Sequence, residues 1–510
     1  MDKSGQGESV QRFPLFRLRR AIRPCQVALI VCSWLLLAAC STTPPGPVSA
    51  GIILLDECTD LAAEFRQSVS DESRTNAGVP ANPALPFLHG TRHADLLITE
   101  IQSDRQAQEL LSYMARLGVD VRRAENTTLA APWSENRLAA LDRCSFRLAL
   151  DVEQTRSREL MIERLQAQPT MAKNYSSLPR WLGAYALLRP IFSWRIDLLH
   201  AEERAAFAAR QAFLEPRSYQ LAPSATLSPL SSLEVATQFS AGYQRSSLAL
   251  PQIEQQTLQR LTQQHAPELV IETLGQQDLL GTPALEESAV TIDTEITTAY
   301  FIPSVTRFAG RNLLQLNYVF WFPAREPRRW LDLYAGELDS LIWRVTLDEN
   351  GDVLLYDSIH SCGCYQKFYL ASQRIRPRSA PLSDEPANIF TLGERSDSGQ
   401  GMRVYLSDNE HYVLGVEARS SRTAAAADVT YRLAPYQALY SLADANGFSS
   451  MFGPDGIVPG SERLERFTLW PTGITNVGAM RQWGTHATGF VNRQHFDDSM
   501  LLDYYFQLVD

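Results

Sequence analysis

The chain has 510 residues, of which 45% are hydrophobic and 20% charged, a composition typical of globular proteins and unlike that of disordered or fibrous ones. Its length favours two or three domains over a single core. Acidic residues outnumber basic ones by 57 to 47, the formal net charge is -10, and no basic cluster follows the N-terminal segment, so nucleic acid is not an expected partner.

Residues 1–39 have the layout of a bacterial lipoprotein signal peptide. Basic residues precede the apolar run VALIVCSWLLLAAC, which is shorter than the roughly 20 apolar residues of a membrane-spanning helix. Leu37, Ala38, Ala39 and Cys40 resemble a lipobox, in which the cysteine receives fatty acids such as palmitate and becomes the N-terminus after cleavage. Cys40 is therefore the expected membrane anchor, and the alternatives are an ordinary cleaved signal peptide or a single anchor helix.

The residue after this cysteine bears on localisation. In the Gram-negative sorting pattern that the sequence resembles, a residue other than Asp at this position favours the outer membrane. Ser41 occupies it here. We therefore expect a lipid anchor in the outer membrane facing the periplasm, followed by a Pro-rich extended tether over residues 40–57.

Cysteine use depends on that localisation. Cys25 and Cys32 would leave with the signal peptide, so four cysteines remain in an oxidising compartment. Four cysteines allow three pairings, and the simplest joins Cys58 to Cys144 and Cys362 to Cys364.

Residues 58–215 are predicted to be mainly helical. In SDRQAQELLSYMARLG, Ser103 is the expected N-cap and Gly118 the expected stop. Further helices are predicted at SENRLAAL, RSRELMIERLQ and AEERAAFAARQAF. The apolar stretch LGAYALLRPIFSW is interrupted by Arg189 and Pro190, which favours a kinked core helix or a helical hairpin over a membrane span.

Residues 216–287 are predicted to be a connector, with a Ser- and Pro-rich linker, the helix PQIEQQTLQRLTQQH and the strand PELVIETL. From residue 288 to 510 the period changes to two. In NLLQLNYVFWF, one face carries Leu314, Leu316, Tyr318, Phe320 and Phe322. Shorter strands follow at RVYLS, HYVLGVE, DVTYRL and RFTLW. The prediction is an α+β protein with an N-terminal helical part and a C-terminal β-rich, largely antiparallel domain without coiled-coil heptads.

The strongest local prediction is a β-hairpin in LIWRVTLDENGDVLLYDSI. Two alternating strands flank Asn350 and Gly351, a pair suited to the positive φ angles of a type I′ turn.

The segment SIHSCGCYQKFY follows this hairpin. On a straight strand His360 and Cys364 would be about 13 Å apart, too far for one metal ion. A shared site or a Cys362–Cys364 disulfide therefore requires a bend, which Gly363 permits. The favoured interpretation is a structural disulfide, and the alternatives are a zinc or copper site, a redox pair or inert thiols.

A metal site would need further ligands from the C-terminal region. The main candidates are His486 and His495, with His411, Asp497 and Asp498 as additional polar residues. None of them forms an H-E-x-x-H or comparable motif, and each lone histidine is more often a surface or hydrogen-bonded core residue. Asp293 and Glu295 could be paired catalytic carboxylates but are more typical of a solvated strand face.

Several catalytic motifs do not occur in the sequence. It contains no G-x-S-x-G elbow, Walker loop or strand-linked G-x-G-x-x-G, so serine hydrolases, NTPases and dinucleotide enzymes are not indicated.

Three phrases carry a resemblance: LLQLNYVFWFPAREP, LDSLIWRVTLDENGDVLLYDSIHSCGCY and MRQWGTHATGFVNRQHFDD. They are similar to a group of uncharacterised proteobacterial lipoproteins of outer-membrane type, over about residues 265 to 370 and 475 to 505. That resemblance implies an envelope protein and no particular activity.

The sequence therefore favours a tethered, non-catalytic binding or structural protein, whose partners are the membrane and an envelope protein and which has no cofactor. The alternative is a periplasmic metalloprotein or hydrolase whose site combines His360, Cys362 and Cys364 with a C-terminal histidine.

Overall fold

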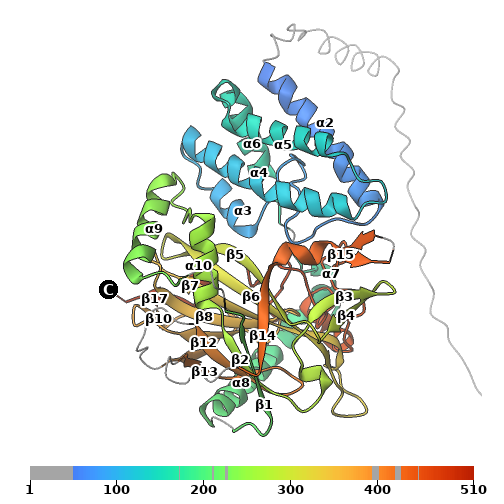
Figure 1. Ribbon diagram of the computed structural model, residues 1–510, viewed down its shortest axis with the longest axis vertical. Coiled ribbons are helices and arrows are strands. Elements are labelled where there is room, and N and C mark those ends of the chain that lie inside the picture. Colours follow the sequence, from blue (N-terminus) through green and yellow to red (C-terminus); the bar gives the residue numbers. More distant parts are fainter. Residues whose placement is uncertain are drawn as a thin grey trace, which may run out of the picture. The chain divides into compact units, whose positions relative to one another are not determined.

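The computed structural model describes residues 50–171, 173–209, 212–223, 228–392, 401–419, 427–445 and 447–509. The predicted signal peptide and the lipobox with Cys40 lie outside these residues. Residues Gly51–Asp510 form one compact unit, in which helices precede a large mixed sheet (Figure 1). This arrangement confirms the α+β class.

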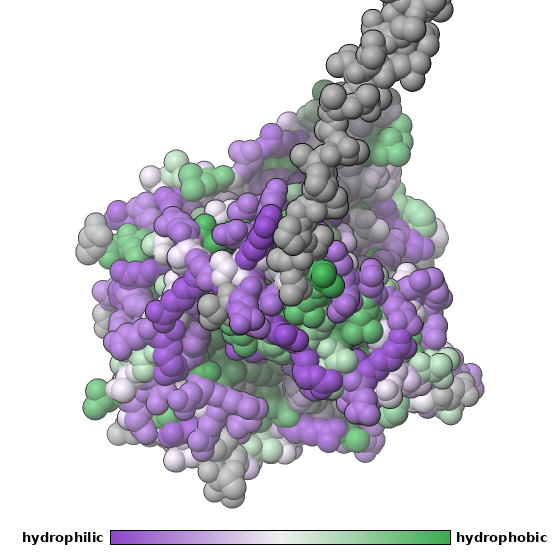
Figure 2. Space-filling model, turned by 90° about the horizontal axis from the view of Figure 1, so that it is seen from above, coloured by the Kyte–Doolittle hydropathy of each residue, from purple (hydrophilic) through white to green (hydrophobic). Residues whose placement is uncertain are grey.

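The N-terminal helices pack around a core of their own. They are α2 (Ala50–Asp71), α3 (Arg92–Ile98), α4 (Asp104–Thr127), α5 (Glu135–Leu150) and α6 (Thr155–Ala167). Their apolar stripes meet in one cluster that includes Phe65, Leu111 and Leu141. The face seen from above in Figure 2 is mainly hydrophilic, with hydrophobic residues in a few patches. Because α2 begins at Ala50, the helix already covers the end of the predicted tether.

Helix α4 begins as predicted and ends later than predicted. The Ser103 side chain accepts a hydrogen bond from the Gln106 amide at 3.3 Å, which confirms the N-cap. Gly118 does not stop the helix, which continues to Thr127. A Cβ at Gly118 would lie 2.8 Å from His89 Nδ1, so this glycine lets the helix approach a buried neighbour.

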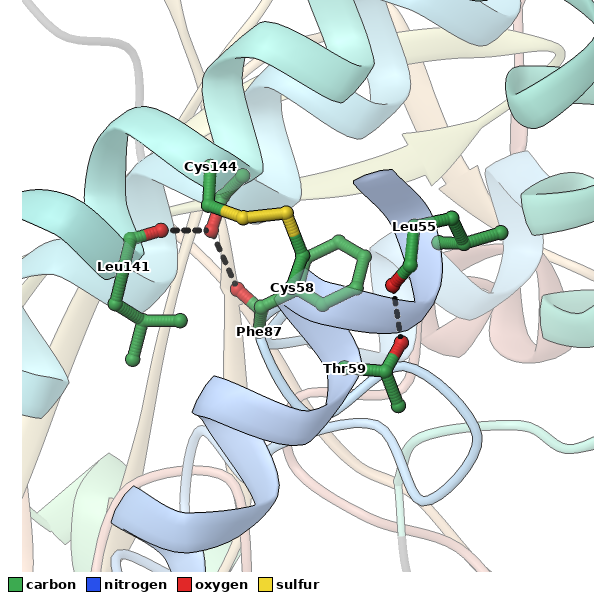
Figure 3. The surroundings of a disulfide bond; sticks show 7 residues. Leu55, Cys58, Thr59, Phe87, Leu141 and Cys144 are labelled. Carbon is green, nitrogen blue, oxygen red and sulfur yellow. Dashed lines mark hydrogen bonds between the residues drawn. A yellow bond between two sulfur atoms is a disulfide. The ribbon is translucent and has the colours of Figure 1, made fainter. Parts of the chain in front are cut away.

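A disulfide joins helices α2 and α5 (Figure 3). Cys58 on α2 and Cys144 on α5 have Cα atoms 5.8 Å apart, within the range that a disulfide spans. Beside it, the Phe87 carbonyl accepts a hydrogen bond from Ser145. The predicted Cys58–Cys144 pairing is confirmed.

The main sheet has eleven strands in the order β11-β9-β8-β7-β6-β5-β14-β1-β2-β12-β13. Six of the ten neighbouring pairs are antiparallel and four are parallel. The strands are β1 (Pro216–Leu221), β2 (Glu268–Glu272), β5 (Thr298–Phe308), β6 (Arg311–Arg325), β7 (Gly336–Leu347), β8 (Val353–His360), β9 (Lys367–Leu370), β11 (Asn388–Thr391), β12 (Met402–Leu406), β13 (Val413–Ala418) and β14 (Val429–Pro435).

Smaller elements complete the described chain. The short two-stranded sheets pair β3 (Thr282–Glu286) with β4 (Ala289–Asp293), β10 (Ile375–Pro377) with β17 (Phe506–Leu508), and β15 (Leu442–Asp444) with β16 (Gly447–Ser449). Short helices are η1 (Val152–Gln154), α7 (Ser177–Leu182), η2 (Gln276–Asp278), η4 (Tyr436–Tyr440), α11 (Arg466–Leu469), η5 (Trp470–Thr472) and α12 (Leu501–Tyr505). The predicted strand RFTLW is wrong, because these residues form α11 and the start of η5.

The predicted hairpin is present as β7 and β8. Its turn differs from the type I′ prediction, because Gly351 has φ +82 whereas Asn350 is not among the residues with positive φ. The turn instead spans Asp348 to Asp352, whose backbone groups are 2.8 Å apart, and the strand register shifts beside it.

Both faces of the central strands are covered. The predicted apolar row of β6 packs with residues of α9 (Ser232–Arg245) and α10 (Gln255–His265). The opposite face of β6 contributes Val319 and Trp321 to a second cluster with Tyr436, Trp483 and Phe496 from the C-terminal segment. The polar residues Gln315 and Asn317 of β6 are accordingly buried and hydrogen-bonded.

The apolar stretch around Pro190 forms neither a core helix nor a hairpin. Its first residue, Leu182, ends α7, and from Tyr185 onward it belongs to the helix α8 (Tyr185–Ala209), which continues through Pro190 and in which only Tyr185 and His200 are buried. Among the described residues, we find no helix that combines the length and the apolar character needed to cross a membrane.

Candidate functional site

The hairpin β7–β8 brings a carboxylate and a histidine together in the interior. Asp339 lies near the start of β7, and His360 ends β8, where it pairs with Leu341. Asp339 Oδ1 is 3.3 Å from His360 Nδ1, and Oδ2 is 2.9 Å from His411 Nδ1. Arg463 Nη2 lies 3.5 Å from Asp339 Oδ1. These four side chains form a buried polar network, here called the Asp339 network.

Within the Asp339 network, the neighbouring side chains stabilise the negative charge of the Asp339 carboxylate. Burial alone would raise the pKa of Asp339, but His360, His411 and Arg463 outweigh it and hold this pKa well below its usual range. Burial lowers the pKa of His360, against the attraction of Asp339, and its Nδ1 donates to that carboxylate. The carboxylate of Asp339 is thus compensated by Arg463, with the two rings as hydrogen-bond donors.

His411 anchors a strained loop to this network. Asn409 and His411 have φ of +58 and +51, in the left-handed region that few residues other than glycine adopt. The His411 ring stacks on Phe322 with centroids 3.9 Å apart, and Asp278 accepts the Asn409 amide at 2.6 Å. The loop is therefore held in a costly conformation by buried contacts.

The SIHSCGCYQKFY segment bends at Gly363, the residue that the sequence indicated would permit a bend. Gly363 has φ +90, and its amide donates to the His360 carbonyl at 2.8 Å, which closes a tight turn. A Cβ at Gly363 would lie 2.3 Å from the Ala487 carbonyl oxygen, so only glycine fits.

The predicted Cys362–Cys364 disulfide is not formed, because both cysteines are buried free thiols in the structure. They are neighbours nonetheless: a hydrogen bond with Cys362, together with burial, raises the pKa of Cys364 well above its usual value. A raised pKa keeps the thiol protonated and poorly nucleophilic.

The histidines proposed as metal ligands do not converge. His360 is committed to Asp339, and His486 lies among Trp483 and Phe496, where burial lowers its pKa to about 3. His495 Nε2 is 3.1 Å from Asn174 Oδ1. Within the described ranges, no three His, Cys, Asp or Glu side chains are arranged to hold a metal ion. The predicted set of His360, Cys362, Cys364, His486 and His495 is therefore not assembled as one site.

The carboxylates considered as an acid–base pair have a local role. Asp293 ends β4, and its Oδ1 accepts the Glu295 amide at 2.9 Å. This contact supports the interpretation as a strand-end turn.

A cavity of about 260 Å³ lies between α8 and the loops held by the Asp339 network. Its floor includes Tyr365 and Tyr412, which directly follow the CGC turn and His411. Apolar side chains of α8 form part of its wall. The lining residues that matter below are Phe192, Ile196, Leu199, Arg325, Tyr334, Tyr365, Tyr412 and Glu465.

Arg325 is the principal cation of this cavity. It ends β6 and is 6% exposed, and Nη1 lies 3.3 Å from the Tyr412 hydroxyl and 3.4 Å from that of Tyr365. Its guanidinium is also 5.5 Å from the Tyr334 ring centroid. Arg325 makes no ion pair with any carboxylate of the described chain, and its Nε has no hydrogen-bond partner. Burial lowers the pKa of Arg325, but Tyr365, Tyr412 and Asp339 outweigh it and raise this pKa, so the guanidinium is charged. No carboxylate of the described residues contacts it, which leaves room for an anion beside it.

The carboxylates of the cavity do not neutralise Arg325 fully. Burial raises the pKa of Glu465 to about 7, against the attraction of Arg463 and Arg325. Glu385 accepts the backbone amides of Phe490, Val491 and Asn492. Glu203 lies 2.9 Å from Lys367 Nζ.

Sequence reasoning missed the residues that line this cavity. It identified His360 and His411, whereas the cavity is lined by the tyrosines that follow them and by Arg325. One signal was present in the sequence: Arg325 ends a long apolar strand, where a charged residue is buried only if the fold gives it a partner or a ligand.

Comparison with known proteins gives no relative: no family model matches the chain, and neither the curated proteins nor the solved structures include a similar one.

Proposed function

We propose that this protein is a non-catalytic binding protein of the bacterial envelope, tethered by lipid at Cys40, which binds a small anionic ligand in the cavity under α8. The observation that carries the proposal is Arg325, a buried guanidinium that lines the cavity without a carboxylate partner in the described chain. A carboxylate or phosphate on the ligand would supply that partner.

The rest of the cavity suits an apolar or aromatic body. Tyr334, Tyr365 and Tyr412 surround the guanidinium, and α8 adds Phe192 and Ile196. Binding sites for small molecules combine such apolar walls with a few polar groups that orient the ligand. The ligand class is therefore a small amphipathic anion.

The test is calorimetric titration with benzoate, octanoate and phenyl phosphate as probes. We expect at least one probe to bind the wild-type protein and Arg325→Gln to weaken that binding about tenfold or more, because a charge-assisted hydrogen bond is lost. Arg189→Gln is the matched control, since Arg189 pairs with the exposed Asp384. Absence of binding for all three probes, or equal loss in both variants, would contradict the proposal.

The tether is tested separately. Cys40→Ala removes the only thiol of the proposed lipobox, so incorporation of radiolabelled palmitate should be abolished and the protein should move from the membrane to the soluble envelope fraction. The Cys58→Ala variant keeps Cys40 and serves as the control for loss of a cysteine. Labelling that persists in Cys40→Ala would disprove the anchor and leave the ligand proposal untouched.

The alternative, a metalloprotein or hydrolase built on His360, Cys362 and Cys364, gains no supporting observation. His360 donates to Asp339, and the two thiols contact each other in a buried turn. Cys364 does line the cavity together with Glu465, but its raised pKa keeps the thiol protonated and poorly nucleophilic.

A further inference from the structure

Helix α8 has two apolar faces. Phe192, Ile196 and Leu199 face the cavity. The second face is exposed and carries Leu187, which is 77% exposed, and Trp194, which is 64% exposed. Figure 1 shows α8 at the bottom of the view, far from helices α2 to α6 at the top. An exposed apolar face of this length on a folded unit is typical of a contact surface.

The residues of this exposed face follow a heptad spacing. They alternate by four and three positions along the helix without a polar interruption, which is the pattern of a coiled-coil seam. The sequence analysis did not detect it because apolar residues on the other face of α8 mask the repeat. The seam consists of Leu187, Ile191, Trp194, Leu198, Ala201, Ala205 and Ala208, all exposed.

The seam is complementary to itself when two copies run antiparallel. Its first half carries large side chains and its second half carries alanines. An antiparallel pair would place Trp194 opposite the alanine at position 205 of the other copy, and Leu198 opposite its position 201. Large side chains then pack against small ones where the two helices overlap, from Ile191 to Ala208, as close packing requires.

The charges beside the seam are complementary in the same register. Positions e and g of the heptads carry Arg195, Asp197, Glu202 and Arg204, all exposed. In the antiparallel register Arg195 faces the Glu202 of the other copy, and Asp197 faces its Arg204. None of these four side chains makes an ion pair within the described residues, although Arg204 donates to Asn388 Oδ1 at 3.2 Å.

We infer that the exposed face of α8 binds a second copy of this chain, as an antiparallel helix pair. The adjacent apolar residues of α7, among them Trp181 at 78% exposure, extend the surface at each end of the pair. A lipid surface fits less well, because the two acidic and two basic residues beside the seam cancel and give no net attraction to anionic head groups. This inference is independent of the anchor. Arg195 also lines the cavity, whereas Trp194 does not, so the test with Trp194 is the one that leaves the ligand site unchanged.

The first test determines whether the protein is a monomer or a dimer in solution. The protein from Ser41 to Asp510, which contains the whole compact unit, is examined by sedimentation velocity over about 1–100 µM. We expect a dimer that Trp194→Glu converts to a monomer, with an unchanged circular dichroism spectrum because Trp194 is exposed. Leu233→Glu is the matched control: Leu233 is 78% exposed on α9 and outside the seam, so this variant should stay dimeric.

The second test is a charge exchange. Arg195→Glu and Glu202→Arg should each raise the dimer dissociation constant about tenfold, because like charges then face each other across the seam. The double variant carries the pair in reversed order and should regain wild-type affinity. A monomeric wild-type protein, a double variant that stays weak, or a monomer that sediments with phosphatidylglycerol vesicles would each overturn the proposal.

Discussion

Asp339 shows how single buried residues position the cavity. Its carboxylate holds His360 at the end of β8 and His411 in a strained loop. Tyr412 directly follows His411, and Tyr365 follows the turn that comes after His360. Both tyrosines line the cavity beside Arg325. The Asp339 network therefore has a positioning role: it helps to hold the hydroxyl groups of Tyr365 and Tyr412 beside the guanidinium of Arg325.

Glu465 should make ligand binding depend on pH. Its pKa is raised to about 7, so the carboxyl is neutral below that pH and ionised above it. An ionised Glu465 both neutralises Arg325 and repels an anion. We expect the affinity for the bound anionic probe to fall as pH rises from about 6 to 8, and Glu465→Gln to remove this dependence. Calorimetric titration at several pH values measures it.

The raised pKa of Glu465 also predicts how the stability of the folded protein depends on pH. Because the folded pKa of Glu465 lies above the value of an exposed glutamate, folding favours the protonated form, and this contribution is lost as pH rises through about 7. Unfolding of Glu465→Gln should therefore show a smaller loss of stability between pH 5 and 8 than the wild-type protein. Identical pH profiles of affinity in the two proteins would refute the role given to Glu465.

Single residues also show which parts of the site could not be predicted from the sequence. The sequence permitted the bend at Gly363 but did not require it, because strand geometry demands a bend only for a shared metal site or a Cys362–Cys364 disulfide, and the structure forms no such disulfide. The role of Arg325 was not predictable, since its neighbours Tyr365 and Tyr412 come from distant parts of the chain. Local spacing cannot reveal a site whose members meet only through the sheet.

Among the elements, prediction succeeded where one periodicity dominated. The hairpin β7–β8 and helix α4 have clear periods, and both are present. Helix α8 has apolar residues on two faces, so its sequence predicted a core element although most of it is exposed. The parallel pairing of β14 with β1 and β5 was also missed, because it joins strands more than a hundred residues apart and leaves no local signal.

At the scale of the whole described unit, the helices and the sheet are joined by buried polar contacts. Gln482 Nε2 donates to Asn76 Oδ1 at 2.7 Å, and the Ala77 amide donates to Gln482 Oε1 at 3.2 Å. Arg92 Nε lies 3.2 Å from Asp497 Oδ1. A Cβ at Gly78 would lie 2.0 Å from the Trp483 carbonyl oxygen, which shows how closely the backbone at Gly78 approaches the backbone at Trp483.

These contacts predict that residues Gly51–Asp510 unfold in one cooperative transition. Gln482→Ala should deprive the Ala77 amide of its acceptor and Asn76 Oδ1 of one of its donors, and so lower the free energy of unfolding by about 1–3 kcal/mol, shifting the single transition as a whole. Differential scanning calorimetry, together with circular dichroism and tryptophan fluorescence, measures this. Gln256→Ala on the exposed side of α10 is the control, since it removes an amide without a buried partner. Two separate transitions, with the N-terminal helices unfolding first, would show that the buried contacts do not couple the two parts.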